Sequence, residues 1–134
     1  MATNTAGSVA RKFHLQAIHY LRRNISYADN GKTVDVGTLP DGAIILKPLS
    51  GVAVNVAFNG DTTNTLDIGP STDTGTNLWA TILALGTIAF VPLDEAVTLL
   101  VSGDTKVQAK VVSSASASAG SAVIVIAYIP NNDL

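Results

Sequence analysis

The stretch from Gly42 to Gly69 reads GAIILKPLSGVAVNVAFNGDTTNTLDIG, and it decides the fold class. Its glycines recur every nine residues, at Gly42, Gly51, Gly60 and Gly69. Strands of about five to seven residues separated by turns give this spacing, which is typical of a β-sandwich or barrel. From residue 52 to residue 58, bulky side chains alternate with small ones, as in a strand with one face against a core.

The composition of the whole chain agrees with this stretch. Val, Ile and Thr make up 38 of the 134 residues, and these β-branched residues favour strands. Charged residues make up only 13%, with a single Glu, so surface helix formers are scarce. We therefore expect an all-β protein: an antiparallel, jelly-roll-like β-sandwich of eight or nine short strands.

The rest of the chain is predicted to form further short strands between turns. The last strand, 122–129, is apolar on both faces, so we expect it in the middle of a sheet or under a partner. Leu78–Leu85 is predicted as a two-turn helix capped by Asn77, and 113–121 as a flexible Ser/Ala hairpin loop. The other predicted strands are 33–36, 43–47, 52–58, 65–68, 87–91, 97–101 and 106–112, and 11–23 is read as a strand or a short helix.

The charges divide the chain into a basic beginning and an acidic remainder. The first 28 residues contain Arg11, Lys12, Arg22 and Arg23 and no acid, whereas the remainder has ten acidic residues and four Lys. We expect a flexible tail over residues 1–10 and one domain over 11–134 that begins with a basic segment, 11–23. The four cations are candidate contacts to a negative partner, or else solvated charges at a strand end.

Catalysis and cofactors are not expected. The chain has no Cys, and its two histidines, His14 and His19, would point to opposite faces of a strand. A nucleophilic triad needs a histidine base beside the nucleophile, and the sequence has neither a Gly-x-Ser-x-Gly elbow nor a phosphate-binding glycine loop. The single Glu95 follows Asp94 at a turn, without a sign of a carboxylate pair tuned for acid–base work.

Three aspartates raise the question of calcium. Asp61, Asp67 and Asp73 recur every six residues in a Thr- and Asn-rich stretch, and oxygen ligands suit Ca²⁺. They do not match the EF-hand pattern, and aspartates at turns commonly accept hydrogen bonds from their own backbone. The three aspartates are therefore either calcium ligands or acceptors for turn backbones, and no metal site is assigned.

Aromatic residues do not indicate a nucleic-acid or sugar surface. Phe58 and Phe90 lie in apolar strands and are expected in the core, and Trp79 is expected in the core or an interface rather than on a ligand platform. No aromatic residues interleave with the four cations, so readout of bases is not expected. The apolar run from Leu78 to Leu93 is too short, and too broken by Gly86 and Pro92, to predict a membrane span.

Several of these segments resemble small structural proteins of tailed bacteriophages. The similar runs are 33–43 (TVDVGTLPDGA), 52–59 (VAVNVAFN), 66–69 (LDIG) and 119–129 (AGSAVIVIAYI). They are strand-and-turn pieces, and none is a catalytic motif. The resemblance implies a capsid decoration, or cement, protein: a jelly-roll-like domain, often trimeric, on the outside of the major capsid shell.

The function expected from this resemblance is structural. The protein would be made in the host cytoplasm, bind the major capsid protein on the virion surface, and stabilise the shell. Arg11, Lys12, Arg22 and Arg23 are the expected contacts to the capsid or to a neighbouring subunit because they form a cationic cluster, not because of the resemblance. Low charge and the two apolar faces of the last strand favour self-association, with a homotrimer expected, although a well-filled core would explain them too. The alternatives are a head-fibre or tail adhesion module, and a tail-tube or head-closure subunit.

Overall fold

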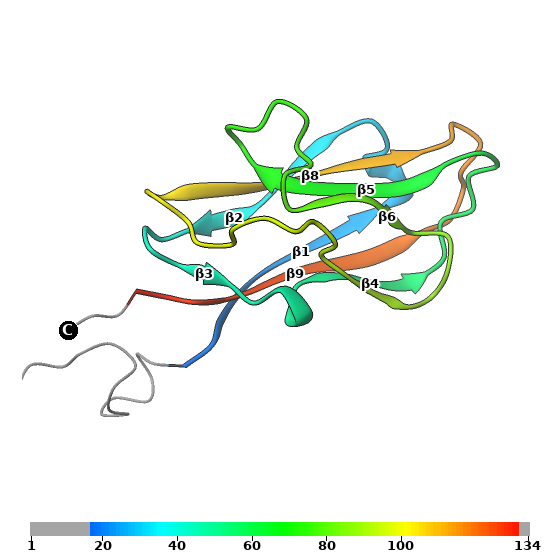
Figure 1. Ribbon diagram of the computed structural model, residues 1–134. Helices are drawn as coiled ribbons and strands as arrows, with labels where there is room; N and C mark the ends of the chain where they lie inside the picture. The colour runs from blue at the N-terminus through cyan, green and yellow to red at the C-terminus, as the bar shows by residue number, and fades with distance from the viewer. Residues whose placement is uncertain (1–16, 132–134) are drawn as a thin grey trace, which may run out of the picture.

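The computed structural model describes residues 17–131, and these form two antiparallel sheets packed face to face (Figure 1). Sheet A has the order β1-β9-β4-β7, with β3 beside the end of β9, and sheet B has the order β2-β8-β5-β6. The strands are β1 (His19–Ser26), β2 (Thr33–Leu39), β3 (Ile44–Ile45), β4 (Gly51–Val56), β5 (Asn64–Pro70), β6 (Ala80–Ala84), β7 (Phe90–Pro92), β8 (Thr105–Ser113) and β9 (Ser121–Ile129).

The strand pairing is that of a jelly roll. The chain forms one long hairpin in which β1 pairs with β9, β2 with β8, β4 with β7 and β5 with β6, all antiparallel. Rolling this hairpin brings β4 beside β9 and β5 beside β8, which closes the two sheets. The fold-class prediction is therefore confirmed, and the described residues contain two 3₁₀ turns, η1 (Tyr27–Asp29) and η2 (Lys47–Leu49), but no α-helix.

The core lies between the two sheets and is built by alternation along each strand. On β8, the buried side chains of Val107, Ala109 and Val111 alternate with side chains that face solvent. On β9, Ile124 and Ile126 are fully buried, and the strand lies between β1 and β4, as its apolar faces predict. Among residues 17–131, the large buried side chains of the core are aliphatic apart from the aromatic residues Phe58 and Trp79, which are buried as expected.

The prediction of a helix over Leu78–Leu85 is wrong, because this segment contains the strand β6. Its residues pair with β5, with Leu83 opposite Leu66 and Ala80 opposite Ile68. A bulge between these pairs places Ile82 at φ 56, outside any regular strand or helix. Pairing with β5 and burial of Leu83 therefore outweigh the local helix signal of the segment.

Other predicted boundaries are corrected by the pairing. Gly69 lies inside β5 rather than in a turn. A Cβ atom at this position would lie 3.0 Å from the backbone nitrogen of Leu78, so the close approach favours glycine. The predicted strand 97–101 makes only a single bridge, from Leu100 to Ile44, together with scattered backbone bonds to the 42–45 segment. The strand read over 11–23 begins at His19 and ends at Ser26, and residues 11–16 lie outside the described part of the chain, as does the predicted tail.

The Ser/Ala segment between β8 and β9 is tied down by hydrogen bonds. The side-chain oxygen Oδ1 of Asn59 accepts from the backbone N–H groups of Ser118 (2.8 Å) and Ala119 (2.9 Å). In the other direction, Ser114 Oγ accepts from the N–H groups of Thr62 and Thr63, each at 2.9 Å. Two loops that are about fifty residues apart in sequence thus hold each other at one end of the sandwich.

Candidate interaction surface

The structure does not bring the predicted cations together. Arg11 and Lys12 lie outside the described residues, whereas Arg22 and Arg23 are exposed neighbours on the edge strand β1. Because successive side chains of a strand point to opposite faces, these two arginines diverge. Arg22 lies opposite Val125 on the outer face of sheet A, and Arg23 reaches toward sheet B.

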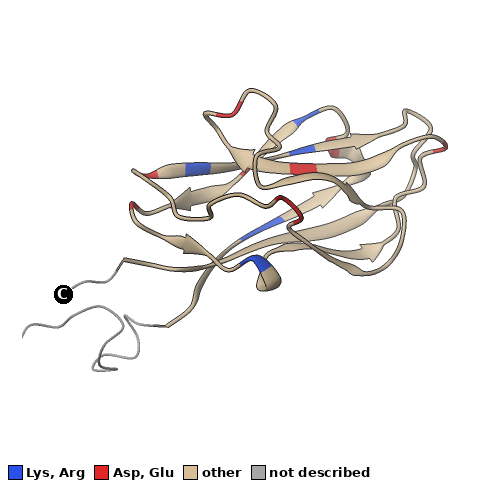
Figure 2. Ribbon diagram, in the orientation of Figure 1, with Lys and Arg blue, Asp and Glu red and all other residues tan. Residues whose placement is uncertain are grey.

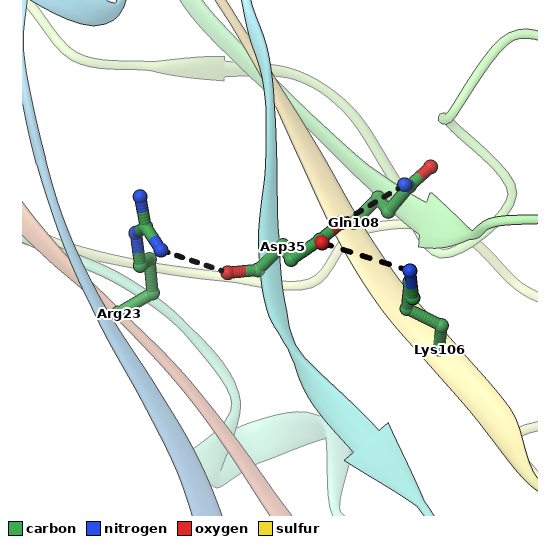
Figure 3. Close-up of polar contacts among 4 residues, drawn as sticks. All are labelled: Arg23, Asp35, Lys106 and Gln108. Carbon is green, nitrogen blue, oxygen red and sulfur yellow. Dashed lines mark hydrogen bonds and ion pairs between the residues drawn. The ribbon is translucent and has the colours of Figure 1, made fainter.

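Arg23 takes part in a small polar network on β2 and β8 (Figure 3). Its Nη1 donates to the backbone carbonyl of Asp35 at 3.4 Å. The carboxylate of Asp35 accepts a hydrogen bond from Gln108 Nε2 at 3.0 Å and lies 3.6 Å from Lys106 Nζ. The Gln108 hydrogen bond is the main cause that lowers the pKa of Asp35, and the positive charges of Lys106 and Arg23 add to it. Arg23 is therefore partly engaged within the fold.

The outer face of sheet A is the most unusual surface of the molecule. In the cross-strand rows of this sheet, Val123 lies opposite Ala53, which lies opposite Phe90, and Ile129 lies opposite Ile44. The ribbons of β3, β4, β7 and β9 carry no Lys, Arg, Asp or Glu (Figure 2). We call this surface the apolar face; its exposed large apolar side chains are Tyr20, Ile44, Val56, Phe90, Leu100 and Ile129.

The short helix η2 stands on the apolar face. It follows β3 and lies against β7 and β9, on the side of sheet A that faces away from sheet B (Figure 1). Leu49 at its end is 53% exposed, which makes it an apolar projection from this face. Lys47 donates from its ammonium group to the backbone carbonyl of Glu95 at 3.1 Å, so this cation is held at the rim.

The sequence did not reveal this surface, and one prediction concerning it is wrong. Phe90 was expected in the core, but its side chain is 47% exposed on the outer side of β7. The only sequence feature that pointed here was the lack of polar residues on either face of 122–129. Because the apolar face is assembled from strands that are far apart in the chain, local patterns could not outline it.

The three aspartates considered for calcium are not gathered into a site. Asp67 on β5 accepts from the Ile82 N–H at 2.7 Å, and Asp73 in the next loop accepts from the Asn77 N–H at 2.7 Å. Hydrogen bonds from Ser116 and Ser114 lower the pKa of Asp61 in the loop before β5. Within residues 17–131, no three His, Asp or Glu side chains group as metal ligands would, so these aspartates act as backbone and loop anchors.

The histidines do not form a site among the described residues. His19 is half-buried at the start of β1, with its ring centroid 5.8 Å from that of Tyr128. His14 lies outside the described residues. In the part of the chain that the structure covers, no helix is long and apolar enough to cross a membrane.

Comparisons with known proteins support the fold. No protein-family model matches the chain. No curated protein matches it in sequence. Among solved structures, it is similar to a chain of a structure described as "Cyanophage Pam1 capsid asymmetric unit", with a TM-score of 0.63, 20% sequence identity, and coverage of 84% of each chain. At this level of identity the likeness shows a shared jelly-roll fold over most of both chains.

Proposed function

We propose that this protein is a structural component of a bacteriophage virion that binds the outside of the capsid and stabilises the shell. The observation that carries the proposal is the jelly-roll pairing of the strands, which is matched over 84% of the chain in a phage capsid structure. The resemblance of the strand-and-turn segments to phage structural proteins points the same way. The proposed location is the virion surface, and the proposed partner is the major capsid protein.

The physical basis of stabilisation is mass action. A protein that binds the assembled shell but not its separated subunits shifts the equilibrium toward the assembled shell. A β-sandwich with a filled aliphatic core is suited to such a role because its surface changes little on binding. The proposal assigns the chain no catalytic step and no cofactor.

The test is binding to shells that lack this protein. The purified chain is mixed with such shells from the phage that encodes it, and bound protein is measured by co-sedimentation. We expect saturable binding and a higher temperature of shell disruption. Immunogold labelling of intact virions should place the protein over the whole head. Labelling confined to the neck or to fibre tips, or no binding to shells, would contradict the proposal.

The basic segment is the proposed electrostatic contribution to attachment. A variant with Arg11, Lys12, Arg22 and Arg23 changed to Ser should bind shells more weakly, and the difference should shrink at high salt because exposed charges are screened. The single variant Arg22→Ser measures the contribution of the cation on the apolar face to shell binding. It leaves unchanged Arg23, which already contacts Asp35. Unchanged binding of the fourfold variant at both low and high salt would exclude the segment as an anchor.

A further inference from the structure

The apolar face is large enough to form a substantial part of a protein–protein contact. The five strands of sheet A contain 28 residues, so with a spacing of about 4.8 Å and a rise of about 3.3 Å per residue they give a flat area of roughly 440 Å². The strands alone thus provide about half of the roughly 800 Å² that each partner buries in a stable protein complex. The side chains that stand out from this plane, Leu49 on η2 among them, add further accessible surface.

The charge on this face fits another molecule of the same chain. Two copies carry the same net negative charge, so they repel wherever both present carboxylates. None of the described strands of sheet A contains an Asp or Glu, whereas sheet B carries Asp35 and Asp67 on its outer face. Arg22 is the one charged strand residue on the apolar face, and it lies on the edge strand β1. Two apolar faces can therefore meet without opposing acids.

The relief of the face also suits packing of one sheet on another. Its middle is made of small side chains, with Gly51 and Ala53 on β4 beside Val123 and Val125 on β9. Larger side chains surround this middle, and the projecting Leu49 is one of these larger side chains. Sheets that pack at about 10 Å interdigitate large side chains with small ones across the interface.

From these observations we infer that the apolar face of sheet A is a contact between two copies of this chain. The contact buries Phe90, Ile44 and Leu49 against a neighbouring copy and leaves the charged face of sheet B to solvent. This inference goes beyond the proposed function and does not depend on it, because it concerns the isolated protein. It also assigns a physical role to the side chain of Phe90, which the core does not use.

The experiment measures mass in solution for three proteins. The double variant Ile44→Lys/Phe90→Lys places cations on the apolar face, and Leu78→Lys is the control, since Leu78 is 45% exposed in the β5–β6 loop and Phe90 is 47% exposed. By sedimentation equilibrium at micromolar concentration, we expect the unchanged chain and the control to be oligomeric. The double variant should associate at least about 100-fold more weakly, because it opposes like charges in the contact.

Salt and a second variant keep the result interpretable. Association through apolar surface should persist at high salt, whereas an electrostatic contact would weaken. Circular dichroism checks that each variant is folded; if the double variant is not, Leu49→Lys on η2 replaces it, since that side chain projects outward. A monomeric unchanged chain, or a folded variant that keeps the oligomer mass, would overturn the inference. Shell binding is measured separately, so a failure of the proposed function is recognised independently.

Discussion

The outer faces of the two sheets differ sharply, although their inner faces are alike. On sheet B, Asp35, Asp67, Lys106 and Lys110 alternate with buried aliphatic residues, which is the pattern of a sheet with one side in water. On sheet A, β9 carries Val123 and Val125 outward where β8 carries cations and Gln, and Ala127 on the same side is buried beside the η2 segment. Apolar residues on both sides of a strand are typical of strands that are covered on both sides. The difference is the reason that the proposed contact is placed on sheet A and the solvent side on sheet B.

The largest effect is expected where sheet A is most closely packed. In Gly51→Ala, the new methyl group would contact the Val91 carbonyl oxygen and lie 2.7 Å from Pro92 Cα, and β7 would have to move. We expect a loss of about 3 kcal/mol in the free energy of unfolding. Chemical denaturation measures it.

The control for this substitution is Gly31→Ala, in the turn before β2 of sheet B. Gly31 has φ 76 but no atom within 4 Å of the added methyl group, so only the backbone conformation costs free energy, about 1 kcal/mol. Similar losses in the two variants would show that strand packing at β4 and β7 is not the stronger constraint.

The next effect concerns a break in the ladder of sheet A. Between β3 and β4, the fully buried Ser50 hydroxyl accepts from the Ala127 N–H at 2.9 Å and donates to the Leu46 carbonyl at 2.8 Å. In Ser50→Ala the Ala127 N–H loses its partner, so we expect a loss of about 2 kcal/mol, measured by thermal unfolding.

Sheet B offers a matched hydroxyl for this test. Thr105 at the start of β8 donates from Oγ1 to the Gly103 carbonyl in an exposed turn, at 2.9 Å. Thr105→Ala should change stability by less than about 0.5 kcal/mol, since water can replace the bond. If both alanine variants lost equally little stability, the Ser50 hydroxyl would not be the group that completes the hydrogen bonding of sheet A.

A smaller effect of opposite sign is expected at the edge of sheet B. Ile82 on β6 is 69% exposed and has φ 56, a conformation that costs a residue with a side chain about 1–2 kcal/mol. Ile82→Gly should therefore raise stability by about 1 kcal/mol, which thermal unfolding detects as a higher midpoint. Ile88→Gly is the control, because Ile88 is 67% exposed and is not at positive φ. A gain in both variants, or in neither, would contradict the assignment of strain to Ile82.

The smallest effect lies in the polar network on sheet B. In Gln108→Ala, the pKa of Asp35 should rise toward its ordinary value, because the Gln108 hydrogen bond is the largest cause of the lowered pKa. Lys106→Ala should raise it too, because both the charge and the hydrogen bond of Lys106 lower this pKa. Carboxyl titration by NMR measures both shifts, and an unchanged pKa of Asp35 in Gln108→Ala would contradict the assignment.

The pH dependence of stability follows from the direction of this shift. The pKa of Asp35 is lowered in the folded state, so its contribution is fully present above the unfolded-state pKa. It is lost as the pH falls through the folded-state pKa. The stability difference between the unchanged chain and Gln108→Ala should therefore disappear in acid. A difference that persisted under those conditions would show that Gln108 stabilises the fold by some other contact.

Elements with a clear local pattern were predictable from sequence. The strands expected over 106–112 and 122–129 are observed as Thr105–Ser113 and Ser121–Ile129, because β-branched residues run between marked turns there. The prediction failed for 78–85, where Leu83 pairs with Leu66 on a distant strand. Of the candidate contacts, Arg22 and Arg23 could be placed on a strand from sequence. Their different surroundings depend on the neighbouring strands β9 and β2.

The sequence by itself determined the class of this protein, because β-branched composition and regular turns act within a few residues of one another. It also indicated that the last strand would lie in the middle of a sheet or under a partner, since each of its faces is apolar, and β9 lies between β1 and β4. Only the tertiary structure decided which residues share a surface. The apolar face unites Tyr20, Phe90 and Ile129 because the rolled hairpin pairs the beginning of the chain with its end and inserts β4 beside β9. Such pairings depend on hydrogen bonds and burial between distant strands, and local sequence patterns do not specify them.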